Sequence, residues 1–259
     1  MKLTVLMENT ACRDDLTAEH GLSLYIEACG KKILFDSGSS AAFADNAEKL
    51  GVDLSKVDLM ILSHGHYDHG GGIRRFMELN KIAPIYLHRR AFAPSVSAAG
   101  TYIGIDKSLK GCDRLYFTEG KVQLAQGLTL FDCNRRKLYA PVDPWGLGLR
   151  RGNTIKPDNF HHEQYLLIEE DGVRICISGC SHKGIENIVN WFSPDVLVGG
   201  FHFMRLEDES VLREKAAALL ESPAVFYTGH CTGEMQYGIL KEVMGSRLHR
   251  IQTGVTLEV

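Results

Sequence analysis

One short segment constrains this chain more than any other, because it holds three histidines and an aspartate within six residues. It follows the apolar run Leu59–Leu62 and reads Ser63-His64-Gly65-His66-Tyr67-Asp68-His69, with three glycines after it. An apolar run that ends in small and polar residues is typical of a buried strand entering a turn. Imidazoles packed so closely repel one another when protonated, and a divalent cation bound to the neutral rings removes that conflict. The segment therefore predicts a metal-binding turn.

The spacing within this turn favours two metal ions rather than one. His64 and His66 can point one way on leaving the strand, while Asp68 and His69 can point to an adjacent position. Such an arrangement suits two metals a few ångström apart that share a hydroxide. The pattern would arise by chance in roughly one of a thousand chains of this composition, so we prefer it to a polar turn with surface histidines.

A site for two metals needs further ligands, which we expect at the ends of other strands. His182 follows an apolar run in Ile177-Ser-Gly-Cys-Ser-His182, directly before a helical pattern. His230 lies in Tyr227-Thr-Gly-His230, which repeats that architecture. We predict both as ligands, with a capping or loop role as the alternative.

Two more residues near these turns are candidates with open roles. Cys180 is either a thiolate that bridges the two metals or a small buried residue. His202, in Gly199-Gly-Phe-His202, could be a ligand, a substrate contact or a proton donor. Cys231 follows a predicted ligand and is expected to be structural.

The other histidines are weaker candidates. At most one of His161 and His162 is expected to face the site, because adjacent side chains on an extended backbone diverge. His88 is expected to be structural, and His20 and His249 to be unrelated to the metals.

The order of apolar runs predicts one α/β domain over residues 1–259. Strand–turn–strand signals dominate the first part, and strands alternate with helices later. This order favours a sandwich of two packed sheets with helices outside. The irregular stretch 91–159 is expected to be a lid or an insertion over a site. Helical periodicity predicts helices over Ser40–Leu50, Gly72–Leu79, Ile185–Phe192, Glu209–Leu220 and Glu234–Val243.

Composition argues against several classes of protein. The net charge of -3 gives no basic surface for nucleic acid, so a nucleic-acid partner is not expected. Seven cysteines without a close pair favour free thiols over disulfides or a zinc finger. No apolar run is long enough to span a bilayer, and no leader-like segment opens the chain. We therefore expect a cytoplasmic protein.

These motifs resemble the metallo-β-lactamase superfamily, whose Ser-His-x-His-x-Asp-His signature is present at 63–69. Leu34-Phe-Asp36-Ser-Gly38 resembles that superfamily's Asp-Gly turn, whose aspartate orients the histidines from behind. A closer resemblance, through Glu19–Ser23, Gly179–His182, Gly199–His202 and Gly229–Gly233, is to a subgroup of metal-dependent hydrolases. That subgroup includes the dihydropterin ribofuranosyl-aminobenzene phosphate synthases.

The resemblance implies an αββα sandwich with two divalent metal ions, zinc first, with manganese or iron as alternatives. His64, His66 and His182 would bind one metal, and Asp68, His69 and His230 the other. Many members of the superfamily place a bridging aspartate where this chain has Cys180, which leaves the bridging ligand open.

The activity implied is hydrolysis of a small ester-like substrate, for example a phosphoester, by metal-activated hydroxide. Asp68 or His202 would carry a proton to the leaving group. The substrate is expected to be an anionic small molecule, for which arginines in and just before the irregular stretch are candidate partners: Arg89, Arg90, Arg135, Arg136, Arg150 and Arg151.

Three other functions compete with hydrolysis. A transferase of the synthase type named above has the same motifs. A di-iron redox enzyme is disfavoured, because no flavin module is visible and the turn reads His64-Gly-His66. A non-catalytic metal-binding or sensor protein would be expected to have lost ligands.

Overall fold

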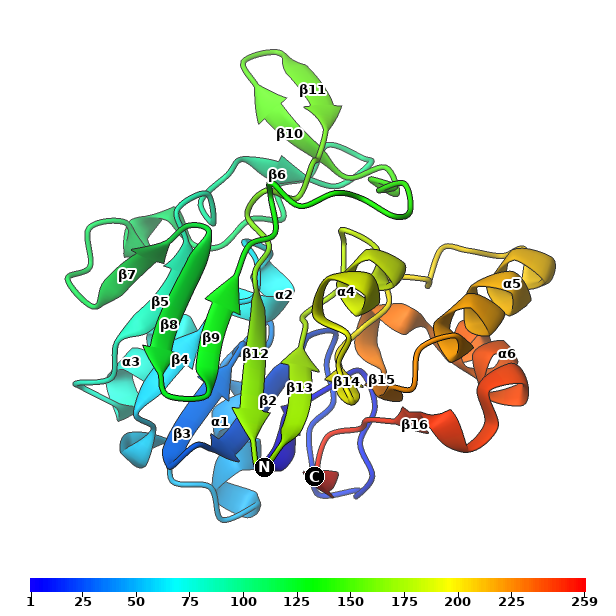
Figure 1. Ribbon diagram of the computed structural model, residues 1–259. Coiled ribbons are helices and arrows are strands. Elements are labelled where there is room, and N and C mark those ends of the chain that lie inside the picture. Colours follow the sequence, from blue (N-terminus) through cyan, green and yellow to red (C-terminus); the bar gives the residue numbers. More distant parts are fainter.

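Residues 1–259 are described by a computed structural model, in which two seven-stranded sheets pack face to face with helices outside (Figure 1). The predicted αββα sandwich is thus confirmed. None of the helices combines the length and the apolar composition needed to cross a bilayer.

The first sheet begins as antiparallel hairpins and ends as parallel strands. Antiparallel pairing joins the strands from β17 to β3, and parallel pairing joins β3, β4, β5 and β7. In spatial order the strands are β17 (Thr256–Glu258), β1 (Lys2–Met7), β2 (Ser23–Ala28), β3 (Lys31–Phe35), β4 (Leu59–Ile61), β5 (Ile85–His88) and β7 (Leu115–Thr118).

The second sheet has a similar division. Its strands β13 to β16 are parallel, while β8, β9, β12 and β13 pair antiparallel. In spatial order they are β16 (Leu248–Arg250), β15 (Val225–Thr228), β14 (Val196–Val198), β13 (Val173–Ile177), β12 (Tyr165–Glu170), β9 (Leu128–Phe131) and β8 (Lys121–Ala125).

Helices cover the outer face of each sheet. The first sheet carries α1 (Ala42–Lys49) and α3 (Ile73–Leu79), and the second carries α4 (Ile185–Phe192), α5 (Glu209–Leu220) and α6 (Glu234–Met244). The short helix α2 (Tyr67–Gly70) lies within the histidine turn. Four 3₁₀ turns complete the set: η1 (Leu54–Lys56), η2 (Lys107–Leu109), η3 (His230–Thr232) and η4 (Gly245–Arg247).

Side chains along each strand alternate between the core between the two sheets and the layer under the outer helices. In β3, Ile33 and Phe35 point into the core between the sheets, while Leu34 points to the layer that contains Phe43 of α1. Side chains of a strand alternate between its two faces, so a strand buried on both faces reads as a continuous apolar run. Each fully buried aliphatic or aromatic side chain contributes about 1.5–3 kcal/mol of transfer free energy.

A third, small sheet projects above one end of the sandwich (Figure 1). It consists of β11 (Thr154–Pro157), β10 (Gly148–Arg151) and β6 (Ser95–Val96), in that order. The stretch 91–159, expected to be a lid or an insertion, therefore contributes to all three sheets. Its strands β7, β8 and β9 belong to the two main sheets, and the segments before and after them form the small sheet. An isolated bridge between His66 and Gly104 connects the segment after β6 to the histidine turn.

Candidate metal centre

The chemically active side chains gather where several strands end. Asp36 follows β3, and the histidine turn follows β4. His182 follows β13, His202 follows β14, and His230 follows β15. Within each sheet these strands are parallel neighbours, so their carboxyl ends meet at one edge. The predicted strand-end histidines are thus brought together.

Two groups of buried donor atoms lie side by side at this edge. Within each group, the donor atoms all lie within 4.8 Å of one another. The rings of His64 and His69, one from each group, are 4.1 Å apart between centroids. The first group is His64, His66 and His182, and the second is Asp68, His69, Cys180 and His230.

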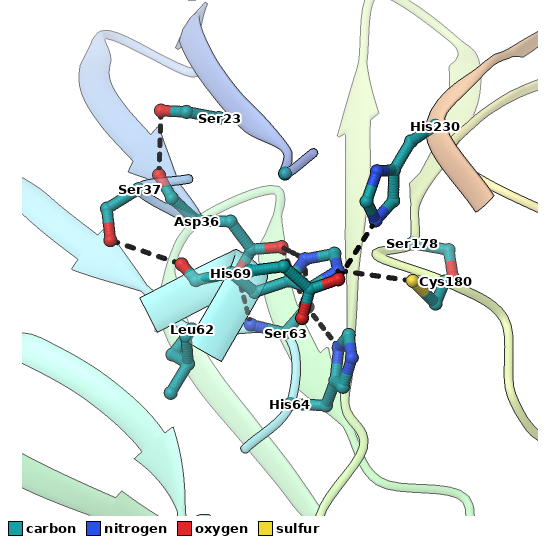
Figure 2. A network of polar contacts seen from close by, with 12 residues as sticks. Ser23, Asp36, Ser37, Leu62, Ser63, His64, His69, Ser178, Cys180 and His230 are labelled. Atoms are coloured by element: carbon teal, nitrogen blue, oxygen red, sulfur yellow. Dashed lines mark hydrogen bonds and ion pairs between the residues drawn. The ribbon is translucent and has the colours of Figure 1, made fainter. Parts of the chain in front are cut away.

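Asp36 fixes the turn from behind (Figure 2). Its Oδ1 accepts the Ser63 N–H at 2.7 Å, and its Oδ2 accepts the Ser63 hydroxyl at 2.6 Å and His69 Nδ1–H at 2.7 Å. The carboxylate is fully buried and its residue has a left-handed backbone, φ 60°. His202 and His230 share that strained conformation (φ 55° and 51°), which is common at functional sites.

The hydrogen bonds set the histidine tautomers. The Ser63 hydroxyl gives its proton to Asp36 and therefore accepts from His64 Nδ1–H at 2.8 Å. His230 Nδ1–H donates to Asn9 Oδ1 at 2.8 Å, as His69 Nδ1–H does to Asp36. In each of these histidines Nε2 is left with its lone pair facing the site, which is the form that binds a metal.

The donor set fits divalent metal ions. His66 Nε2 and His230 Nε2 are buried without a hydrogen-bond partner, although burying an unpaired polar atom costs about 1–3 kcal/mol. His64 Nε2 and His182 Nε2 are 3.2 Å apart. Two nitrogens bound tetrahedrally at the usual zinc distance would be about 3.3 Å apart. Metal coordination would therefore satisfy these atoms with little rearrangement.

The two halves of the site differ in charge. Burial, and then the neighbouring rings, lower the pKa of His64 and His182 well below the usual value, so both are neutral. Burial also lowers the pKa of His69, but Asp68 and Asp36 outweigh it and raise that pKa overall. The carboxylates near His69 thus favour a positive charge at its ring, which is a proton on Nε2 in the metal-free protein and would be a metal ion in the proton's place when metal binds.

We expect the metal-free protein to lose stability as the pH falls from about 6.5. Burial lowers the pKa of His66 to about 3, and those of His202 and His230 to about 4. Below about 6.5 these histidines bind protons in the unfolded chain but not in the native one, so each costs up to about 2 kcal/mol between pH 7 and 5. Urea unfolding after chelation, repeated from pH 8 to 5, measures the effect. A flat profile would contradict neutral burial.

A cavity of about 200 Å³ opens onto both donor groups. His202 lies at its wall, with its ring 4.3 Å from that of His182 and its Nδ1 unpartnered. Arg205 also lines it and donates to the Trp145 carbonyl at 2.7 Å. The other lining residues are His20, His66, Tyr67, Asp68, Ser97, Ile103, Leu147, Cys180, His182, Met204 and Cys231.

His20 lies beside the second donor group, which differs from the expectation that it is unrelated to the metals. Its Nε2 lies 3.3 Å from Asp68 Oδ2, its ring is 4.8 Å from that of His230, and 45% of its side chain is exposed. The segment Glu19–Ser23, in which it lies, was part of the family resemblance and was the available signal. His249 does lie elsewhere, stacked on Tyr227.

Of the adjacent pair, His162 faces the site and His161 does not. His162 Nδ1 accepts the Gly65 N–H at 3.0 Å, so its Nε2 carries the proton and donates to Asp158 at 3.2 Å. Although Asp158 and His162 lie near His66, both nitrogens of His162 are occupied, and the pair holds the turn rather than a third metal. Gly65 itself is required, since a Cβ there would meet the Ala91 carbonyl oxygen at 2.0 Å.

We expect His162→Gln to weaken metal binding by about 10–100-fold, the usual effect of losing a partner behind the ligands. The variant removes the bond to Asp158 and loosens the Gly65 amide between His64 and His66. Competition with a chromophoric chelator measures the affinity. The half-buried His161, which does not contact the histidine turn, is replaced by Gln as the matched control, and equal affinities of the two variants would contradict this role.

The remaining candidates fall outside the cavity. His88 is buried and its Nε2 lies 3.2 Å from Asp132, which agrees with a structural role. None of the six candidate arginines lines the cavity that opens onto the donor groups. Asn9, which orients His230 from far away in the chain, and Asp158, which orients His162 four residues later, carried no sequence signal for these roles.

Comparisons with known proteins find relatives that are similar in sequence and in fold. The 7,8-dihydropterin-6-methyl-4-(beta-D-ribofuranosyl)-aminobenzene-5'-phosphate synthase of Methanocaldococcus jannaschii is 29% identical over 264 aligned residues, which cover 92% of this chain and 89% of that protein. The crystal structure of Tm1679, a metal-dependent hydrolase of the beta-lactamase superfamily, matches with a TM-score of 0.82 and 27% identity over 100% of this chain and 99% of that one.

A more distant structure shares the fold. Zn²⁺-bound PqqB from Methylobacterium extorquens matches with a TM-score of 0.56 and 12% identity over 100% of both chains. The family profile described as the Metallo-beta-lactamase superfamily matches residues 16–230. That match takes in both donor groups and most of the two sheets, and so this chain belongs to the metallo-beta-lactamase superfamily.

Proposed function

We propose that this protein is a metal-dependent hydrolase that cleaves a small anionic ester, a phosphoester above all. The observation that carries the proposal is the pair of adjacent donor groups, His64/His66/His182 and Asp68/His69/Cys180/His230, facing one cavity. We propose that each group holds one divalent ion, zinc in preference to manganese or iron, because imidazole, thiolate and carboxylate suit zinc. Such ions supply hydroxide at neutral pH and polarise the oxygen of the bond to be cleaved.

The chain's own residues would bind the substrate and move the proton. Arg205 is the cationic side chain at the cavity wall and suits an anionic group of the substrate. His202, neutral and unpartnered at Nδ1, is placed to donate a proton to a leaving group once it has acquired one from solvent. Asp68 is within 3.3 Å of His20, which is half-exposed and could pass protons between Asp68 and solvent.

Cys180 belongs to the second donor group, with its Sγ 3.1 Å from His69 Nε2. Burial, and then Cys231, raise the pKa of its thiol well above the usual value, so without a metal it is protonated. A bound cation would favour the thiolate. We propose Cys180 as a ligand, in the place where many relatives have an aspartate.

A second candidate function is a transferase of the synthase type. The observation in its favour is the 29% identity with the Methanocaldococcus jannaschii synthase over 92% of this chain. That protein's name describes a product with a 5'-phosphate, which also fits an anionic substrate. A third candidate function is that of a non-catalytic metal-binding protein on this fold. Bound metal without turnover of any substrate would support it.

Metal analysis followed by turnover on the same sample tests the proposal. We expect about two equivalents of zinc, manganese or iron, and turnover of a chromogenic substrate from a panel of phosphodiester, phosphomonoester, lactone and thioester. Two metals without ester turnover would instead favour the synthase-type transferase. Incubation with an aryl ribosyl phosphate and a dihydropterin that carries a leaving group on its 6-methyl carbon then tests that function. No metal after reconstitution would overturn both enzyme readings.

A further inference from the structure

A second cavity, of about 400 Å³, lies beside the base of the small sheet and shares no lining residue with the cavity of the metal centre. We propose that it binds a small molecule bearing a phosphate group, as a site separate from the metal centre. The walls come from the segment after β5, the residue that follows η2, strand β10 and the loop 159–162. Figure 1 shows β10 rising above the sandwich at this end of the molecule.

The charge of this cavity is the first argument. Arg89, Arg90, Lys110 and Arg151 line it, and no carboxylate does. Among them, only Arg89 forms an ion pair, with Glu119 at 2.8 Å. Three cations are therefore left without a counter-charge in one cavity of a chain whose net charge is -3. Like charges held together are unfavourable, and a dianion bound between them would relieve that cost.

The donors suit phosphate. Arg90 Nη1 lies 2.8 Å from His161 Nδ1, which must accept, because a guanidinium only donates. Arg90 is thereby held at the wall, with its other N–H groups available to a ligand. Guanidinium groups bind phosphate oxygens in pairs of hydrogen bonds, and a lysine adds a point charge.

Apolar side chains give the cavity room for an organic group. Phe92, Pro94 and Leu149 line it beside the cations, and the Lys110 ammonium lies 5.7 Å from the centre of the Phe92 ring. A volume of about 400 Å³ is within the usual range for sites of small organic molecules. A phosphate carried by a small apolar or aromatic group therefore fits better than a free inorganic ion.

The neighbouring basic cavity is a weaker candidate. It shares Arg90 and His161 with the proposed site, and it is also lined by Arg135 and Arg136. However, Glu119 and Asp132 line it too, so carboxylates offset part of its charge. The proposed site is thus the cavity around Arg90, Lys110 and Arg151.

This site cannot place a ligand on the reacting atoms. His162 stands between the proposed site and the metal centre. Its side chain lines the proposed site, and its ring is 5.2 Å from that of His66. A molecule bound there would contact the loop that holds the Gly65 amide, and not the donor atoms. Binding at this site and catalysis at the metal centre can therefore be tested separately.

Backbone amide NMR of the metal-loaded protein tests the proposal, with inorganic phosphate and phenylphosphonate as probes at constant ionic strength. Phenylphosphonate carries the dianion on an aromatic group through a bond that hydrolysis does not cleave. We expect both to shift amides of residues 89–93, 149–151 and 159–162, with phenylphosphonate binding more tightly. The double variant Lys110→Ala/Arg151→Gln should weaken binding by about tenfold.

The control variant Lys81→Ala/Arg13→Gln removes the same charge at exposed positions elsewhere and should bind as the natural chain does. Shifts confined to residues 64–69 and 180–182 would mean that phosphate binds only at the metal centre, and would overturn the proposal. Equal binding by the two double variants would also overturn it. If the spectrum of the unliganded test variant shows a disturbed fold, Lys110→Ala alone replaces it.

Discussion

His66→Ala is expected to fold normally and to lose metal together with more than about 100-fold of its activity. His66 is buried, and its Nε2 has no hydrogen-bond partner, so no contact that stabilises the fold is lost at that atom. Burial, and then the neighbouring His162, also lower the pKa of His66 to about 3. Losing a residue behind a ligand costs about 10–100-fold, and losing a ligand should exceed that. Metal content, turnover and urea unfolding of the metal-free protein measure the three effects.

The separation of these effects is what makes the variant informative. We expect its metal-free form to unfold within about 1 kcal/mol of the natural chain, since the side chain removed contributes an unpaired polar atom. His249→Ala is the control, because His249 stacks on Tyr227 outside the metal centre. Full metal content in His66→Ala would remove this residue from the first donor group, and a metal-poor control would show a nonspecific effect.

Much of this architecture could be predicted from the sequence, because strand ends and turn residues are local signals. The apolar run before Ser63 is strand β4, and the predicted helices over Ile185–Phe192 and Glu209–Leu220 have the predicted bounds. The histidines that follow β13 and β15 meet the turn after β4 because parallel strands present their carboxyl ends together.

The rest depends on contacts that no local pattern reports. Asn9 orients His230 across 221 residues of sequence, and Asp158 acts on the turn only through His162. His20 lies beside Asp68 because its loop returns to that edge, where the Leu22 N–H donates to the Asp68 carbonyl. The irregular stretch 91–159 contains three strands of the main sheets as well as the small sheet. This division could not be predicted, because length and composition do not show which strands pair.

Asp36→Ala is expected to have the largest effect on stability, lowering the free energy of unfolding of the metal-free protein by about 3–5 kcal/mol. The carboxylate accepts three hydrogen bonds in a fully buried position, two of them from Ser63 and one from His69. Its removal leaves these donors unpaired, at a cost of about 1–3 kcal/mol for each that finds no new partner. Urea unfolding after chelation measures the loss, and Asp14→Ala, at an exposed position, should show almost none.

Comparison with Asp36→Asn separates the hydrogen bonds from the volume of the side chain. An asparagine keeps one acceptor oxygen, but its amide group would face either the Ser63 N–H or the pair of donors on Oδ2. We therefore expect an intermediate loss of stability, and a weaker metal affinity, because His69 no longer has a carboxylate to fix its tautomer. If alanine and asparagine were equally harmless, Asp36 would not be the residue that holds the histidine turn. If asparagine kept both stability and affinity while alanine lost them, its shape rather than its charge would be what the turn requires.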